Sequence, residues 1–211
     1  MCLRIRTSAP PMGRRGHRNP AMDRRLSNPP VPGAPVDFSF KCINSVEDVL
    51  LEEPRLGVRP LKRCENGKLL SQALRLNNNT LTDLKGFGET AEKLLSDPPQ
   101  LRWIDLSFND LSTIDSVLPK YRNLSVLNLH SNSIRQLSQV DKLAALPNLK
   151  SLTLHGNPIE GERGYRCYIL SVLPQLKTLD FSAVTKQDRV TADVWRRMNM
   201  KPRRLRRNKD E

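Results

Sequence analysis

The sequence is poor in aromatic residues and in cysteine, and it has no long apolar run. Aromatic side chains make up 5% of its 211 residues, so a core has to be built mainly from aliphatic groups. No apolar run approaches the length that spans a membrane. The cysteines (Cys2, Cys42, Cys64 and Cys167) are far apart and form no CxxC pair, which indicates free thiols in a reducing compartment. We therefore expect a cytoplasmic protein without a disulfide framework.

The sequence also lacks the motifs of catalysis and cofactor binding. It contains no GxGxxG, P-loop, HExxH or GxSxG segment. Of its histidines, His17 lies near the N-terminus, whereas His130 and His155 occupy matching positions about one strand apart, ~4.8 Å. No third ligand is clearly placed beside them, so we expect neither a metal nor a cofactor. These absences favour a protein that is not an enzyme.

Acidic residues are scarce at both ends of the chain, where most of the net charge of +13 is found. Residues 1–36 hold seven Arg against one Asp, and residues 196–211 hold eight Lys and Arg against two acids. The remaining residues balance 20 basic against 19 acidic groups. Basic tails of this kind either attach weakly to acidic surfaces or nucleic acid, or only solvate the ends. The nearly neutral body argues against a nucleic-acid groove in the folded part.

Residues 1–36 are rich in proline and arginine, and we expect them to be a disordered tail. An arginine-rich start also fits a mitochondrial presequence, but the prolines oppose the amphipathic helix that such a signal needs. Met12 and Met22 are alternative starts, so whether residues 1–21 belong to the working protein stays open. Residues 37–69 form the predicted N-terminal cap, in which Ser45-x-x-Asp48 is a capping-box-like start of a short helix. Val46, Val49 and Leu50 are expected on one face of that helix.

The middle of the chain repeats. The segments QALRLNNNTL, LRWIDLSFNDL, LSVLNLHSNSI and LKSLTLHGNPI align on one asparagine each, at spacings of 30, 23 and 25 residues. A fifth segment, LKTLDFSAV, keeps Leu176, Leu179 and Phe181 at the inward positions and has Val184 in place of the asparagine. The alternating aliphatics predict one short strand per repeat, and the asparagine side chains are expected to satisfy the turns as a ladder. The predicted ladder consists of Asn79, Asn109, Asn132 and Asn157.

This pattern, L-x-x-L-x-L-x-x-N-x-L, is that of leucine-rich repeats. It predicts an α/β fold, a short, right-handed, curved solenoid with a parallel β-sheet on the concave face and helical N- and C-terminal caps. About four to five repeats occupy residues 70–184, including a C-terminal repeat cap. A capping helix is expected over residues 185–199, starting at Thr185-x-x-Asp188, with Val190, Val194 and Met198 spaced like one helix face and Trp195 adjacent. Residues 200–211 are expected to be a basic disordered tail.

The outward positions of the predicted strands form the candidate binding surface, because side chains alternate between the two faces of a sheet. Trp103 and Val126 form an apolar pair along one margin, and tryptophan is enriched at interface hot spots. Phe108 is a further candidate at the other margin. In the alternative, Trp103 is covered by the segment around Phe38 and Phe40. The predicted partner-binding residues are Arg75, Asn77, Trp103, Asp105, Ser107, Val126, Asn128, His130, Thr153, His155 and Asp180.

Residues 157–180, NPIEGERGYRCYILSVLPQLKTLD, resemble the C-terminal cap of the SDS-twenty-two-like leucine-rich repeat proteins. That family contains intracellular binding modules without catalysis, among them the spliceosomal U2 A-prime protein, a light chain of axonemal dynein and regulatory subunits of protein phosphatase 1. The resemblance implies a protein-interaction adaptor that is monomeric by itself, binds a protein partner on its concave sheet and works in a ciliary or axonemal complex. Two alternatives stay open: an RNA-associated nuclear scaffold like the U2 A-prime protein, and a phosphatase-regulatory subunit.

Overall fold

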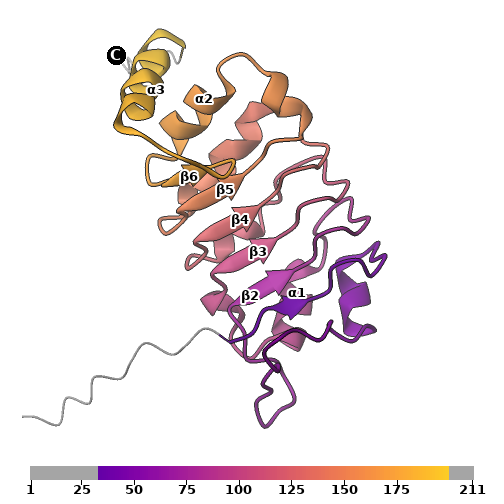
Figure 1. The fold of residues 1–211 in the computed structure, drawn as a ribbon. Coiled ribbons are helices and arrows are strands. Elements are labelled where there is room, and N and C mark those ends of the chain that lie inside the picture. Colours follow the sequence, from indigo (N-terminus) through magenta and orange to yellow (C-terminus); the bar gives the residue numbers. More distant parts are fainter. Residues whose placement is uncertain (1–32, 200–211) are drawn as a thin grey trace, which may run out of the picture. The chain divides into compact units, whose positions relative to one another are not determined.

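The computed structural model describes residues 33–199, which form a stack of short strands with helices along one side of it (Figure 1). Within these residues the strands make one sheet in chain order. The pairs from β1 to β6 are parallel, and β6 pairs with β7 in the antiparallel direction. The strands are β1 (Val36–Asp37), β2 (Ala73–Arg75), β3 (Trp103–Asp105), β4 (Val126–Asn128), β5 (Ser151–Thr153), β6 (Thr178–Leu179) and β7 (Ser182–Ala183). The predicted leucine-rich repeat solenoid of the α/β class is confirmed.

The register of the sheet aligns one aliphatic side chain per repeat. Leu74 pairs with Ile104, Ile104 with Leu127, Leu127 with Leu152, and Leu152 with Leu179. All five are buried in a continuous aliphatic core. Burial of such stacked side chains is the main source of stability in a repeat fold, because each repeat covers the apolar face of its neighbours.

The length of each repeat decides which helix covers the outer side. The 30-residue interval between the first two ladder asparagines has room for an α-helix, whereas the 23- and 25-residue intervals are spanned by 3-10 helices. The helices are η1 (Val46–Leu50), α1 (Phe87–Leu94), η2 (Pro98–Gln100), η3 (Leu118–Lys120), η4 (Leu137–Ala145), η5 (Pro158–Gly161), α2 (Tyr165–Val172) and α3 (Lys186–Asn199).

The ladder asparagines are buried and tie each repeat to the one before it. The side-chain oxygen of Asn109 accepts a hydrogen bond from the amide of Leu81, at 3.0 Å. Its amide nitrogen donates to the carbonyls of Leu76, at 2.9 Å, and Leu106, at 3.1 Å. Every turn therefore has its otherwise unpaired backbone groups satisfied by one side chain. The same bonding pattern recurs at Asn79, Asn132 and Asn157.

The N-terminal end of the stack begins earlier than the sequence indicated. Ala34 and Val36 are buried, and Val36 already pairs with Leu74, so the tail boundary drawn at residue 36 is wrong. The reason is that Val36 extends the aliphatic column by one strand. The capping box of Ser45 and Asp48 is present, but the helix it starts is of the 3-10 type and leaves Leu50 exposed.

The C-terminal end is covered by α3, which packs against α2 (Figure 1). The amide of Asp188 donates to the Thr185 hydroxyl, and the Thr185 amide donates to the Asp188 carboxylate, which makes the predicted capping box. The predicted apolar face is exposed to solvent. Val190, Val194 and Met198 are exposed, because the helix turns Ala192 and Trp195 toward α2 instead.

The predictions for most of the N-terminal tail and for residues 200–211 lie outside the described residues. Within residues 33–199, no helix is long and apolar enough to cross a membrane. The cysteines of this part, Cys42, Cys64 and Cys167, are all free thiols.

Candidate functional site

Side chains on the concave face of the sheet lie in rows that cross the strands. The register places Ala73, Trp103, Val126, Ser151 and Thr178 in one row. A second row contains Arg75, Asp105, Asn128 and Thr153. Just beyond the strand ends, equivalent positions of successive repeats carry Asn77, Ser107, His130 and His155. Neighbours within a row are about one strand spacing apart, ~4.8 Å, so their side chains touch.

Because neighbouring side chains within each row touch, the predicted binding residues are less accessible to solvent than the sequence indicated. None of the eleven is exposed, because short parallel strands on a concave surface crowd their outward side chains together. Six of them are half-buried: Arg75, Trp103, Val126, His130, His155 and Asp180. The other five are buried: Asn77, Asp105, Ser107, Asn128 and Thr153.

The middle row is an internal polar network. The Asp105 carboxylate accepts hydrogen bonds from the Ser107 hydroxyl, at 2.6 Å, and from the Asn128 amide, at 3.1 Å. Arg75 donates to Asp37 of β1, at 2.8 Å. The carboxylate, hydroxyl and amide groups that bond one another in this way stabilise the sheet and have few bonds left for a partner, whereas the buried Nε of Arg75 has no hydrogen-bond partner among residues 33–199.

Trp103 differs from the exposed hot spot that the sequence predicted. The residue is half-buried, between Ala73 and Val126 in its row. Its indole Nε1 is buried and has no hydrogen-bond partner among residues 33–199. A buried donor without a partner costs about 1–3 kcal/mol, so Trp103 is partly a packing residue that carries a penalty.

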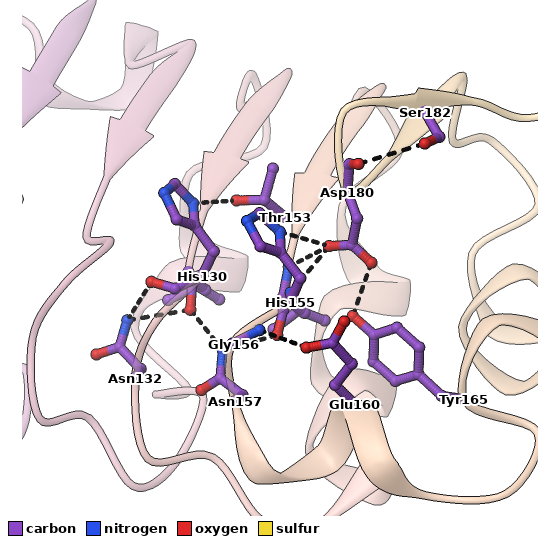
Figure 2. Close-up of polar contacts among 12 residues, drawn as sticks. His130, Asn132, Thr153, His155, Gly156, Asn157, Glu160, Tyr165, Asp180 and Ser182 are labelled. Carbon is purple, nitrogen blue, oxygen red and sulfur yellow. Dashed lines mark hydrogen bonds and ion pairs between the residues drawn. The ribbon is translucent and has the colours of Figure 1, made fainter.

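Asp180 holds the end of the sheet together (Figure 2). It has a left-handed backbone, with φ of 51°, and its Oδ1 accepts from the amides of Leu154, at 2.7 Å, and His155, at 3.0 Å. Its Oδ2 accepts from the hydroxyl of Tyr165, at 2.9 Å. Burial, and then the nearby Asp180 carboxylate, raise the pKa of Tyr165. The oxygens of Asp180 are therefore engaged inside the fold, although its negative charge remains beside the concave face.

His130 and His155 stack on each other at the edge of the sheet, with parallel rings and Nδ1 atoms turned toward neighbouring side chains (Figure 2). The ring centroids are 4.7 Å apart and the interplanar angle is 7°. The Nδ1 of His130 is 2.8 Å from the Thr153 hydroxyl, and the Nδ1 of His155 is 3.3 Å from Asp180. These bonds fix both rings, so the stack is a rigid surface.

Phe108 and Phe181 complete a cluster of four rings. The Phe108 centroid is 5.2 Å from that of His130, and the Phe181 centroid lies 5.6 Å from His130 and 5.5 Å from His155. All three pairs have the edge-to-face geometry that aromatic rings prefer. Phe108 is 50% and Phe181 is 70% exposed. We call these four residues, Phe108, His130, His155 and Phe181, the aromatic patch.

The backbone at both phenylalanines is unfavourable for a bulky residue. Phe108 has φ of 53° and Phe181 has φ of 59°, in the left-handed region that glycine and asparagine tolerate best. The position of Phe108, directly before the ladder asparagine, is left-handed in the other repeats as well, where it holds Asn78, Ser131 and Gly156. A large apolar side chain that faces water from a strained backbone adds little to folding, and such residues cluster at functional sites.

The surroundings of His130 favour its neutral imidazole. Burial, followed by the proximity of His155, lowers the pKa of His130 below its ordinary value of 6.5. The carboxylates of Asp105 and Asp180 act in the opposite direction and are weaker. At neutral pH the His130 imidazole is therefore uncharged, and two carboxylates lie close to it.

This arrangement offers a surface for contact with another molecule. Among the described residues, no group of three or more His, Cys, Asp and Glu could hold a metal ion. The imidazoles stack face to face, so neither ring is placed as a base for the other. The chemistry available is apolar and aromatic contact, bordered by negative charge.

Sequence reasoning missed Phe181 and ranked Phe108 below Trp103. A signal for Phe108 was present, because the residue before the ladder asparagine is small or polar in the other three repeats. Phe181 was assigned to an inward position of the fifth, degenerate segment, but it is exposed, and its ring contacts the histidines from the turn into β7.

Comparison with known proteins agrees with this fold. The family model described as "Leucine-rich repeat" matches residues 100–206. The chain is 57% identical over 183 residues to leucine-rich repeat-containing protein 51 of Macaca mulatta, covering 87% of this chain and 95% of that protein. It is 56% identical over 181 residues to the Homo sapiens protein of the same name, covering 86% and 94%.

A solved structure gives the same picture at a greater distance. The Drosophila melanogaster SNF/U2A′ complex contains a chain with a TM-score of 0.52 and 27% identity, covering 60% of this chain and 69% of that one. The repeats, the sheet and these relatives agree: the chain belongs to the leucine-rich repeat proteins, in the family of leucine-rich repeat-containing protein 51.

Proposed function

We propose that this chain is a non-enzymatic adaptor that binds a protein partner at the concave sheet, with the aromatic patch at the centre of the contact. The observation that carries the proposal is the pair Phe108 and Phe181, two half- to mostly exposed phenylalanines on strained backbone, packed around a fixed histidine stack. Rigid aromatic surface is what interface hot spots use, because little conformational entropy is lost when it binds.

The family supports the adaptor role in general terms. Leucine-rich repeat proteins are generally scaffolds without catalysis, and the solved relative was crystallised in a complex with SNF. The resemblance to a light chain of axonemal dynein supports a cytoplasmic protein in a ciliary or axonemal complex as the setting. An adaptor that presents one concave face needs no second copy, so we propose that it is monomeric by itself.

Affinity purification of a tagged chain tests the proposal. The test variant is Phe108→Ser with Phe181→Ser, because serine fits the left-handed backbone at the equivalent Ser131. The matched control is Val190→Ser with Val194→Ser, which removes exposed apolar surface from α3. Recovery of the partner should fall by roughly tenfold or more for the test variant and stay unchanged for the control. Equal recovery from both variants contradicts the proposal.

The same experiment separates the alternatives. Recovery of a phosphatase catalytic chain that depends on Phe108 and Phe181 makes the adaptor a regulatory subunit. An RNA-associated scaffold predicts partners that disappear at high salt and on deletion of residues 200–211, since phosphate contacts weaken steeply with salt. Binding through the aromatic patch survives both treatments.

A further inference from the structure

The first turn of the stack contains an aromatic ring at the position equivalent to Phe108, and this ring contacts a charged group. By the register of β1 and β2, Phe40 occupies the same position as Asn78, and therefore as Phe108 in the next repeat. Its backbone is left-handed too, with φ of 57°, and its ring is 63% exposed. The guanidinium carbon of Arg55 lies 5.8 Å from the centroid of this ring. That distance is within the range of a cation–π contact.

The aromatic patch offers the same chemistry on a larger surface. Two phenylalanine rings and two stacked imidazoles lie together, instead of one ring. The acidic groups that act on His130 are the carboxylates of Asp105 and Asp180. Residues 37–195 balance their basic and acidic groups to within one charge, so the folded body does not strongly repel a cation. The local charge therefore favours a cationic guest over an anionic one.

We propose that the aromatic patch binds the guanidinium group of an arginine side chain on the partner. The inference rests on the proposed function and specifies the partner's chemistry. A guanidinium is planar and weakly hydrated, so it stacks on phenylalanine and imidazole faces as Arg55 does on Phe40. A lysine ammonium matches the charge but not the planar shape.

Selection from a random peptide library on the full chain at pH 7.5 tests the inference. The test variant is Phe108→Leu with Phe181→Leu, which keeps apolar volume and removes the aromatic faces. The matched control is Phe40→Leu, at the same repeat position but outside the aromatic patch. Peptides selected on the wild type should share an arginine, and the test variant should lose them while the control keeps them. A second variant, Phe108→Tyr with Phe181→Tyr, restores aromatic faces and should restore the selection.

The selected peptide is then titrated with its arginine replaced by lysine or by leucine. Either replacement should weaken binding to the wild type by roughly three- to tenfold and should have no such effect on the Phe108→Leu, Phe181→Leu chain. Peptides that require Phe108 and Phe181 but share leucine, tryptophan or acidic residues overturn the inference and leave the proposed function standing. Binders that ignore both phenylalanines, or a library without binders, contradict the inference and the proposed function together.

Discussion

The residue before each ladder asparagine shows how one repeat position can serve folding or binding. Its backbone is left-handed at residues 78, 108, 131 and 156, because the chain must turn there before the asparagine can enter the ladder. Asparagine, serine and glycine adopt this conformation at low cost, whereas phenylalanine does not. The choice of Phe108 therefore follows from what its ring contacts and not from what the turn requires.

The stability of a Phe108→Asn variant checks this division. Loss of the partly buried ring is offset by relief of the left-handed strain, so the free energy of unfolding should change by less than about 1 kcal/mol. Phe38→Ala is the comparison, since Phe38 is fully buried in the core and its truncation should cost about 3–5 kcal/mol. Urea denaturation of both variants measures the difference. A Phe108→Asn cost as large as that of Phe38→Ala shows that Phe108 is a core residue.

At the scale of the element, α3 is positioned by a close approach of α2. Gly164 precedes α2 with φ of 82°, and a Cβ atom on it would lie 2.5 Å from the indole nitrogen of Trp195. The same indole packs edge-to-face on Tyr168, at 5.9 Å between centroids. Arg166 of α2 pairs with Asp188 of α3, at 3.0 Å. The absence of a side chain at Gly164 thus allows the Trp195 ring to pack against α2, and the ion pair fixes the direction of α3.

Substitution of Gly164 by alanine should destabilise this end of the stack. The change combines left-handed strain with displacement of the Trp195 ring, for a loss of about 2–4 kcal/mol in the free energy of unfolding. Gly161→Ala is the matched control, because a Cβ atom there meets nothing within 4 Å and the substitution should change stability by less than about 1 kcal/mol. Tryptophan fluorescence during denaturation, measured in a Trp103→Phe background for both variants, reports the effect at the helix itself. Similar stability of the two variants argues against a close-packed α2–α3 contact.

The elements that could be predicted from the sequence are those determined by local residue patterns and not by contacts between distant segments. The strands and the ladder follow from a local repeat, so the sequence predicted the asparagine positions and the ~4.8 Å stack of His130 on His155. The outer helices depend on the length of each interval, and the buried face of α3 depends on α2, so neither followed from local periodicity. The accessibility of Trp103 and Asp105 depends on the crowding of side chains across the concave sheet, which a single strand does not encode.

At the scale of the whole molecule, titratable groups at the edge of the sheet and in α3 limit the stability of the fold to a range of pH. Burial, and then His155, lower the pKa of His130, and hydrogen bonds from Arg166 hold the pKa of Asp188 well below its ordinary 3.8. The folded chain therefore binds these protons less tightly than the unfolded chain does. The contribution of each group to the free energy of unfolding is fully present above its unfolded pKa. It is lost as the pH falls, first below about 6.5 for His130 and then below about 4 for Asp188.

The tyrosines set the alkaline limit with the opposite sign. Burial raises the pKa of Tyr121 and of Tyr168 to about 12, and it raises that of Tyr165 as well, so the folded chain keeps protons that the unfolded chain loses near pH 10. Stability should therefore fall as the pH rises above 10.

Urea midpoints measured from pH 5 to pH 11 should form a plateau between about pH 7 and pH 9.5. His130→Asn should flatten the decline between pH 7 and pH 5.5, and the phenolic absorbance of the wild type should change only as the chain unfolds. A tyrosine that ionises at pH 10 in the folded protein contradicts its burial in the stack. If His130→Asn leaves the loss of stability between pH 7 and pH 5.5 unchanged, protonation of His130 is not its cause.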